Sequence, residues 1–559
     1  MPISRACGLV EGAETLRASG AVGEGYVGSV DQVWPCGSGG IDRSIERSSY
    51  RGDDSEILNE PDALAQMNGS RRHSLMPKIT RFCNVTVFDG SGRPGFTADV
   101  EIDGDRIVSV GPSTGVEADE FDGTGLALAP GFIDVHTHDD IAVMVDPDHG
   151  CKTLQGVTSV VVGNCGMSAA PVSDDPLGFS RYPRLADYLR EVESARPAVN
   201  VGALVGHGTV RAAVMGLKTD REPNNREREA MIQHVVAALE DGALGMSSGL
   251  AYEPGRFAAH DELVDLAEVV AAASGVYTTH MRDEGRDLIA SIEESIDVSE
   301  ATGVALQISH LKASGRDAWG KTAAALAAID TARERGVDVM ADQYPYTRGS
   351  TLLEQIVGAG ALDGPSAFAH VQPKDLLIAA APGNPHWEGH TIEAIAADEG
   401  VTGREMADRI VEAEGRSCFV IIDSMSEDDV REVIQHPAVM TGSDGVPGGS
   451  RPHPRLHHTY PRVLGHYSRD EGLLELADAV HRMTGMCADR FGFEDRGAIR
   501  KGAFADLVLF DPNTIIDTGT YTDPTTVPEG IRGVWVNGER VVANGEVTGT
   551  RSGRIIRRP

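Results

Sequence analysis

The sequence predicts an α/β protein whose main body is a (β/α)8 TIM barrel, with a small β-sandwich domain formed from both chain ends. Two observations predict this fold. Between residues 126 and 497, short apolar runs alternate eight times with amphipathic, helix-like segments, which is the pattern of a barrel of parallel strands. On either side, residues 77–125 and 498–559 contain β-type runs separated by Gly and Asp turns. We therefore expect one large barrel and one smaller domain.

The composition narrows the classes of function. The chain has 559 residues, of which 41% are hydrophobic, so it can bury a substantial core. Its 84 acidic and 50 basic residues give a formal net charge of -34, which argues against nucleic acids or anionic membranes as partners because both are polyanions. No apolar run is long enough to cross a membrane, and the first residues lack a secretory signal. We expect a cytoplasmic protein that acts on a small molecule.

Residues 1–76 precede the first strand-like segment, and we expect them to form a disordered extension. They are rich in Gly, Ser, Arg and acidic residues and show no sustained periodicity. The first β-type runs follow, in ITRFCNVTVFD and ADVEIDGDRIVSVG. A matching set, which includes ADLVLFDP and IRGVWVNGERVVANGEV, lies near the C-terminus. The two sets are expected to share one small domain.

Eight apolar runs account for the strands of the predicted barrel. Each precedes a helix-like segment such as REREAMIQHVVAALEDG, in which the final Gly is the expected helix stop. In chain order the runs are GFIDVHTH, TSVVVGNCG, NVGALVGHG, ALGMSSGL, GVYTTHMRD, ALQISHLK, VDVMADQYPY and AVMTGSDG. About ninety residues separate the last two runs, where one helix with its loops needs about thirty. We expect an insertion, at about residues 350–435, over the barrel mouth.

Metal-binding side chains gather at the ends of these strands. His136 and His138 alternate along the first run, so both point to one face, which at the end of a barrel strand is the interior. An HxH pair alone is a weak signal. Cys165, His280 and His310 each end another run, and the mouth of a barrel collects the ends of all its strands. Imidazole and thiolate donors in this number predict a zinc-type site.

Asp444 lies in MTGSDG, at the end of the eighth run. Ser-Asp-Gly is also ordinary turn chemistry, so a turn carboxylate is the simpler interpretation. Opposite a metal centre, however, a carboxylate can accept the proton of an attacking water and later return it to a leaving group. Asp444 is therefore the candidate catalytic residue.

Taken together, the motifs resemble those of one enzyme family. The strings GFIDVHTHDD, GVTSVVVGNCG, SSGLAYEPG, YTTHMRDEG, ISHLK, DQYPYT, GSDG and HPR are similar, in this order, to those of the N-acyl-D-amino-acid deacylases (D-aminoacylases) of the amidohydrolase superfamily. The resemblance covers the chain from about residue 78 to its end. It implies zinc-dependent hydrolysis of N-acyl-D-amino acids to a carboxylate and a free D-amino acid, with Asp444 moving the proton.

The resemblance also implies the metal ligands. Many superfamily members bridge two metals with a carboxylated lysine on strand 4, but the fourth run, ALGMSSGL, contains no lysine. The D-aminoacylase pattern uses a cysteine from strand 2 instead, and Cys165 matches it. By this resemblance Cys165, His280 and His310 hold one tight Zn2+, whereas His136 and His138 form a weaker second divalent site.

Four further residues resemble the family's substrate-binding positions. Lys312 and Arg455 match cationic positions for the substrate α-carboxylate, with Tyr344 and Tyr252 as hydroxyl partners. For the tyrosines, packing at the barrel rim is the alternative. An ammonium beside a metal ligand is costly without an anion, which favours substrate binding for Lys312.

The preferred substrate is predicted from the start of the insertion. STLLEQIVGAGALDG is mostly apolar and favours a hydrophobic D-side chain, whereas the nearby Arg348 would favour N-acyl-D-Glu or N-acyl-D-Asp. Cyclic amides, as used by a dihydroorotase or hydantoinase, are a further alternative, against which the missing strand-4 lysine and the strings GNCG, ISHLK and HPR argue. A non-enzymatic scaffold of this fold would have no physical need of the five ligands and Asp444.

Overall fold

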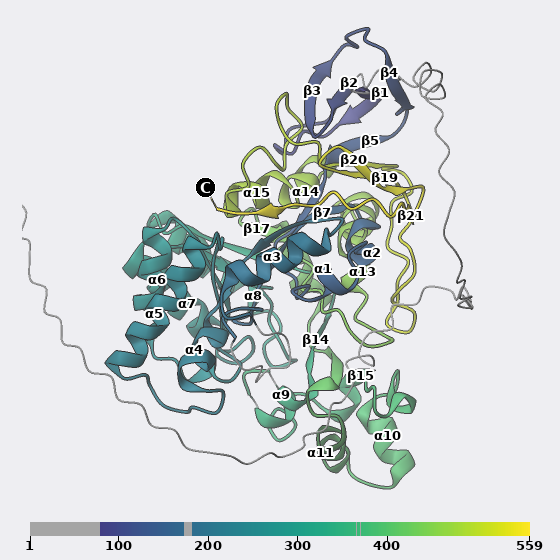
Figure 1. The fold of residues 1–559 in the computed structure, drawn as a ribbon. Coiled ribbons are helices and arrows are strands. Elements are labelled where there is room, and N and C mark those ends of the chain that lie inside the picture. Colours follow the sequence, from purple (N-terminus) through teal and green to yellow (C-terminus); the bar gives the residue numbers. More distant parts are fainter. Residues whose placement is uncertain (1–78, 173–181, 365, 369, 559) are drawn as a thin grey trace, which may run out of the picture.

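The computed structural model describes residues 79–172, 182–364, 366–368 and 370–558, which form a mixed α/β fold (Figure 1). The expected N-terminal extension, residues 1–76, lies outside the described residues. Parallel strands lie at the centre with helices around them, and a smaller lobe that carries β14 and α9–α11 extends below them in the view of Figure 1. No helix in the described part of the chain has both the length and the apolar character required to span a bilayer.

The central strands are parallel and follow one another in chain order. β6 (Phe132–Asp134) pairs with β7 (Val157–Val162), and β7 pairs with β8 (Asn200–Ala203). After Leu204 the chain continues as β9, and the remaining strands pair in the order β9 (Val205–Gly206), β10 (Gly245–Gly249), β11 (Val276–His280), β12 (Ala305–Ile308), β13 (Val339–Gln343) and β17 (Val439–Thr441). A parallel bridge between Thr137 and Gly445 joins the two ends of this series.

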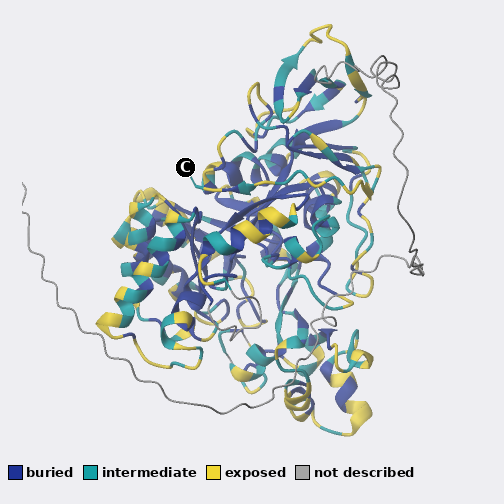
Figure 2. Ribbon diagram, viewed as in Figure 1, coloured by how far each residue is buried: buried dark blue, intermediate teal, exposed yellow. Residues whose placement is uncertain are grey.

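These strands form where the sequence is apolar on both faces. β7, with the sequence VTSVVV, is buried at every position, as expected for a strand covered on both sides. Amphipathic helices pack around the strands, and in Figure 2 their outer faces are exposed while the strands are buried. These helices are α5 (Asn225–Glu240), α6 (His260–Ala272), α7 (Leu288–Thr302), α8 (Thr322–Glu334) and α12 (Glu427–Gln435). Local signals set their bounds: Asn224 caps α5, and Gly303, with φ of 71°, follows α7.

A second sheet combines strands from both ends of the described chain. β5 (Ala127–Pro130) pairs antiparallel with β18 (Leu507–Phe510), which joins the early strands to the late ones. The other members are β1 (Ile79–Val87), β2 (Phe96–Asp103), β3 (Arg106–Gly111), β4 (Ala118–Asp122), β19 (Ile531–Val536), β20 (Glu539–Ala543) and β21 (Glu546–Val547). A last strand, β22 (Ile555–Ile556), runs parallel to β8 and so ties the C-terminal segment to the central strands.

The long connection between β13 and β17 contains its own small sheet and core. β14 (Arg348–Leu352) and β15 (Leu376–Ala380) both pair antiparallel with β16 (Phe419–Asp423). α9 (Leu353–Gly358), α10 (Ile392–Glu399) and α11 (Gly403–Glu414) share one apolar cluster with these strands. This segment forms the lower lobe in Figure 1.

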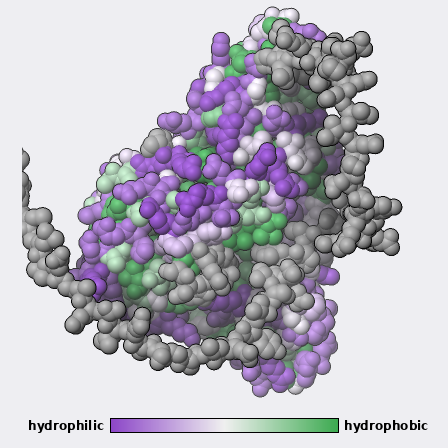
Figure 3. All heavy atoms as spheres, in the orientation of Figure 1, coloured by the Kyte–Doolittle hydropathy of each residue, from purple (hydrophilic) through white to green (hydrophobic). Residues whose placement is uncertain are grey.

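The remaining α-helices pack against the central strands or against one another. They are α1 (Ala142–Val145), α2 (Gly150–Thr153), α3 (Leu185–Ala195), α4 (His207–Met215), α13 (Arg455–Arg462), α14 (Leu476–Arg482) and α15 (Gly485–Phe491). The face seen in Figure 3 is mainly hydrophilic, with apolar residues in separate patches, which suits a chain with a large net charge. The candidate site lies between the carboxyl ends of the parallel strands and the inserted lobe.

Candidate active site

The carboxyl ends of the parallel strands bring all the predicted metal ligands together. His136 and His138 follow β6, Cys165 follows β7, His280 ends β11 and His310 follows β12. Their donor atoms form two overlapping groups, in each of which all donors lie within 4.8 Å of one another. Cys165 belongs to both: one group is His136, His138, Cys165 and Asp444, and the other is Cys165, His280 and His310.

The spacing of the second group fits a tetrahedral ion. The Cys165 sulfur lies 3.4 Å from His310 Nε2, and His280 Nδ1 lies 2.8 Å from the same nitrogen. Tetrahedral zinc, with bonds of about 2.3 Å to sulfur and about 2.0 Å to nitrogen, would separate such donors by about 3.6 Å and about 3.3 Å. The observed separations are within about 0.5 Å of these values. The donor set therefore fits zinc by both type and spacing.

The protonation states of two of these donors suit a metal, whereas His310 must lose a proton to bind one: burial and Lys312 lower the pKa of His310, but Glu284, Cys165 and Asp444 outweigh them and raise it. Burial raises the pKa of the Cys165 thiol, but the imidazoles of His136 and His310 outweigh it and hold this pKa well below its usual range. Burial lowers the pKa of His280, which keeps that imidazole neutral. A thiolate and a neutral imidazole are the forms that bind zinc.

The backbone is unusual at three of these positions. Cys165, His310 and Asp444 have φ angles of 53°, 36° and 48°, in the left-handed region that residues other than Gly rarely adopt. Such conformations persist where the surrounding structure holds them, and they cluster at functional sites. After Cys165, the chain passes so close to β10 that a Cβ on Gly166 would lie 2.6 Å from Gly249 N, which explains the glycine there.

Asp444 faces the first group of donors. Its Oδ1 atom lies 3.2 Å from His138 Nε2 and 3.5 Å from His136 Nε2, and its Oδ2 atom lies 2.9 Å from Arg455 Nη1. Burial raises the pKa of this carboxyl, but Arg455, His310 and His136 together hold it well below its usual range. Asp444 is therefore a carboxylate at neutral pH and can accept a proton.

Two carboxylates behind the ligands were missed by sequence reasoning. Asp342, on β13, accepts a hydrogen bond from His310 N over 2.8 Å and lies 3.1 Å from His136 Nδ1. Glu284, four residues after His280, lies 2.8 Å from His310 Nδ1. A carboxylate on the far nitrogen of a ligating histidine fixes its tautomer and orientation. Both residues lie in the strings DQYPYT and YTTHMRDEG, so strand-end position was the signal available for them.

Lys312 already has an anionic partner within the chain. Its Nζ atom lies 2.6 Å from Glu284 Oε1 and 2.8 Å from His310 Nδ1. The ammonium is therefore paired with Glu284, and its burial does not by itself require a substrate anion. Lys312 nevertheless lines the same cavity as the metal-binding residues.

Arg455, the first residue of α13, is buried beside Asp444 and retains unused hydrogen-bonding capacity. Its guanidinium stacks 4.4 Å above the Tyr344 ring, and Nη2 donates to Ser350 O over 3.3 Å. Among the described residues its Nε atom has no hydrogen-bond partner. The Tyr252 ring packs 4.5 Å from the ring of His280, across the site. A buried guanidinium with an unused donor is suited to bind a carboxylate.

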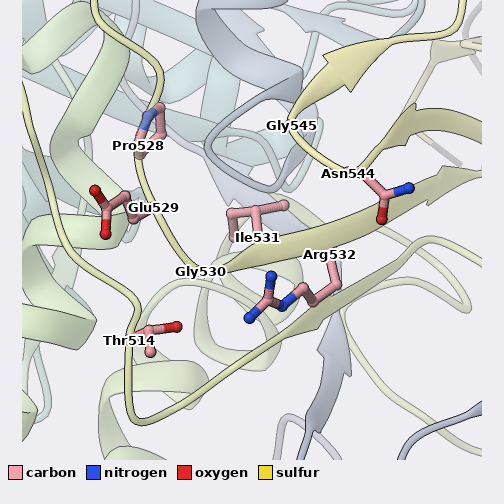
Figure 4. A pocket seen from close by; sticks show the side chains of 8 residues that line it. All are labelled: Thr514, Pro528, Glu529, Gly530, Ile531, Arg532, Asn544 and Gly545. Atoms are coloured by element: carbon pink, nitrogen blue, oxygen red, sulfur yellow. The ribbon is translucent and has the colours of Figure 1, made fainter.

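One cavity of about 470 Å³ connects these groups. Of the ten predicted site residues, all but the fully buried His136 line it. Arg348 does not: its guanidinium lies 3.6 Å from Asp423 and stacks on Tyr521. A separate hollow beside β19 is lined by Thr514, Pro528–Arg532, Asn544 and Gly545 (Figure 4). The described residues that line this hollow include no histidine or cysteine, so their donors do not suit zinc.

Comparisons with known proteins show the family to which the chain belongs. A model of the amidohydrolase family matches residues 119–542. A D-aminoacylase of Alcaligenes xylosoxydans xylosoxydans is 39% identical over 484 residues, which cover 85% of this chain and 96% of that protein. An N-acyl-D-glutamate deacylase of the same organism is 40% identical over 486 residues, which cover 84% of this chain and 95% of that protein.

A solved structure extends the likeness to three dimensions. The crystal structure of N-acyl-D-glutamate deacylase from Bordetella bronchiseptica, complexed with zinc and a phosphonate that mimics the tetrahedral intermediate, is 38% identical in sequence. It matches with a TM-score of 0.79 over 86% of this chain and 100% of that one. The family match and these near full-length relatives show that the chain belongs to the amidohydrolase family, in the group of the N-acyl-D-amino-acid deacylases.

Proposed function

We propose that this protein hydrolyses the amide bond of N-acyl-D-amino acids in a zinc-dependent reaction, releasing a carboxylate and a free D-amino acid. One observation carries the proposal: the Cys165 donor group, the Asp444 carboxylate and the Arg455 guanidinium share one cavity. The pairing of the central strands supports a closed (β/α)8 barrel, with residues 77–125 and 498–559 as a small β-domain and residues 350–435 as an insertion. A barrel places its active site where these side chains lie, at the carboxyl ends of the strands.

Cys165, His280 and His310 would hold one zinc ion tightly, and His136 and His138 a weaker second divalent ion. When bound, zinc supplies a Lewis acid that polarises an amide carbonyl and makes water more acidic. Glu284 and Asp342 orient the imidazoles of His310 and His136 through the contacts described above.

Asp444 moves the proton in the proposed reaction. It accepts the proton of the attacking water and then donates it to the substrate nitrogen as the C–N bond breaks, because without this proton the nitrogen would have to leave as a strongly basic amide anion. Its contacts with His138 and Arg455 fix the carboxylate in one orientation. General acid–base catalysis of this kind contributes about 10²–10⁴-fold to a rate.

Arg455 binds the substrate α-carboxylate in this proposal, with Lys312, Tyr344 and Tyr252 around it. The unused Nε donor of Arg455 and its stacking on Tyr344 support this role. Both cations are paired within the chain, Lys312 with Glu284 and Arg455 with Asp444, and we assign Arg455 the main part because of its unused Nε donor. Lys312, Tyr344 and Arg455 follow the neighbouring strands β12, β13 and β17, whereas Tyr252 follows β10.

The substrate side chain is proposed to be hydrophobic and to face the inserted lobe. There Leu352, Phe368, Phe419 and Ile422 line the cavity. Apolar walls favour an apolar side chain, since burying an unpaired carboxylate among them would be costly. The second candidate is an acidic D-side chain, favoured by Arg416, which also lines the cavity and lies 3.6 Å from Glu354.

A direct assay tests this proposal. The purified, zinc-supplemented protein is offered N-acetyl-D-leucine, N-acetyl-D-glutamate and N-acetyl-L-leucine, and amine release is measured. We expect the highest kcat/KM for N-acetyl-D-leucine. Faster hydrolysis of N-acetyl-D-glutamate would replace the hydrophobic preference by the acidic one. Absence of hydrolysis of both D-substrates, or a preference for the L-substrate, would overturn the proposed activity.

A further inference from the structure

Lys152 is a fully buried lysine that neither lines the cavity nor belongs to the ligand set. It lies on the short helix α2 and has 0% of its surface exposed. Its Nζ atom donates to Asp134 Oδ2 over 2.6 Å and to Ser443 Oγ over 2.7 Å, and Asp139 Oδ2 lies 3.5 Å away. A buried ammonium is tolerated only when it is paired and hydrogen-bonded, and here two carboxylates and a hydroxyl surround it.

Ser443 links this lysine to the turn at residues 443–445, which carries Asp444. Its hydroxyl accepts from Lys152 and, over 3.0 Å, from Gly445 N, and it donates to Asp134 Oδ2 over 2.6 Å. Its backbone N donates to Asp134 Oδ1 over 2.9 Å. The hydrogen-bonding capacity of the serine hydroxyl is therefore filled by contacts with β6, α2 and its own turn.

The residue held between these contacts is Asp444. Its φ of 48° is left-handed, a conformation that a residue other than Gly keeps only when its surroundings hold it. Asp444 N donates to His136 O over 2.7 Å, and His138 N donates to Gly445 O over 2.9 Å. The turn packs closely against the lysine: a Cβ atom placed on Gly445 would lie 2.8 Å from Lys152 Nζ.

We propose that Lys152 is a positioning residue for Asp444: through Ser443 and Asp134 it holds the strained turn that aims the carboxylate at His138. This inference rests on the proposed function for the role of Asp444. Lys152 touches no substrate, since it does not line the cavity, and it acts on the reaction only through the geometry of the turn. A misplacement of about 1 Å in a catalytic group can reduce turnover by about a hundredfold.

Two variants test the link at its two ends. Lys152→Met keeps an unbranched side chain only one atom shorter and removes its charge, whereas Ser443→Ala keeps the Lys152–Asp134 pair and removes the hydroxyl that joins it to the turn. For both we expect kcat to fall about 10- to 100-fold, while KM changes less than about threefold and zinc content is unchanged. Arg81→Met is the matched control, because Arg81 pairs with the buried Glu101 over 2.7 Å within the second sheet, away from Asp444.

Comparison with the control separates positioning from general stability. Lys152→Met and Arg81→Met each break a buried ion pair and should both lower the melting temperature, but only Lys152→Met should lower kcat. If kcat of folded, zinc-loaded Lys152→Met and Ser443→Ala stays within twofold of the parent, the proposal is overturned. Equal losses of kcat in Lys152→Met and Arg81→Met would also overturn it, since these would follow from stability alone.

A crystal structure of a folded variant, with Ser443→Ala as the substitute if Lys152→Met does not fold, gives an answer that does not depend on activity. We expect the separation of 3.2 Å between Asp444 Oδ1 and His138 Nε2 to increase in the variant. An Asp444 that keeps its left-handed conformation and this distance overturns the role of Lys152. If the parent protein shows no deacylase activity, the proposed function fails, and the crystal structure still decides whether Lys152 holds the turn.

Discussion

Replacing Asp444 by asparagine removes the proposed proton acceptor with little change in shape. The amide cannot accept the proton of water at neutral pH, so the general acid–base contribution of about 10²–10⁴-fold should be lost. At about 1.4 kcal/mol per decade, this loss corresponds to about 3–5 kcal/mol in the activation free energy. The effect belongs to kcat, because the proton moves only as the reaction proceeds.

The structure also predicts the sign of the change in KM. Asp444 Oδ2 lies 2.9 Å from Arg455, so the wild-type carboxylate competes with the substrate carboxylate for the guanidinium. Asp444→Asn removes this competition, and KM for N-acetyl-D-leucine should stay the same or fall. Zinc content should be retained, since Cys165, His280 and His310 remain.

Steady-state amine release and metal analysis check this prediction. Asp423→Asn is the control: Asp423 is also paired with an arginine, Arg348, but it is 41% exposed and does not line the cavity. The control should keep kcat. A kcat of Asp444→Asn within tenfold of the parent, or a loss confined to a higher KM, would refute the assignment of Asp444 as the proton shuttle.

Three further predictions concern metal, substrate and pH. Cys165→Ala should lose the tightly bound zinc measured by elemental analysis, whereas Cys487→Ala, which alters another buried cysteine, should keep it; equal zinc in both would remove Cys165 from the ligand set. Arg455→Met should lower kcat/KM for N-acetyl-D-leucine about 10- to 100-fold and lower it less for the corresponding D-amide without a carboxylate, and an equal loss for both would contradict carboxylate binding. Burial raises the pKa of Glu101, but hydrogen bonds from Thr114 and Arg81 outweigh it and hold this pKa below its usual range. The stability that Glu101 contributes is therefore present above its unfolded pKa of about 4.3 and is lost as the pH falls through its folded pKa. Glu101→Gln should accordingly be less stable than the parent at pH 7 in urea unfolding, with a difference that shrinks toward pH 3; a constant difference would argue against this linkage.

The fold was predictable where local pattern and global structure agree. A strand covered on both faces is mostly apolar along its length, so a run such as the one that forms β7 can be recognised as a strand from its own sequence alone. The small sheet of the insertion was not predicted, because β14, with the sequence RGSTL, is mostly polar and pairs with the apolar β16 only through tertiary contacts. The strand β22 has two residues, too few for any periodicity.

The site was predictable as far as strand ends define it. Every predicted ligand lies at such an end because parallel strands collect their carboxyl ends at one face. The hydrogen-bond and ion-pair partners of these residues were not predictable, because they depend on the direction in which each side chain points. Glu284 balances Lys312, which sequence reasoning treated as free to bind a substrate anion. Lys152 and Ser443 are 291 positions apart and meet only in the folded chain.

Titration of the metal-free protein with zinc tests the central claim most directly, namely that catalysis of N-acyl-D-amino-acid hydrolysis depends on the Cys165 centre. The rate of amine release from N-acetyl-D-leucine is followed as zinc is added, in the parent and in Cys165→Ala. We expect no activity without metal, a rise that levels off at about one zinc per chain in the parent, and no rise over this range in Cys165→Ala. Full activity of the metal-free parent, or the same titration curve for both proteins, would contradict it.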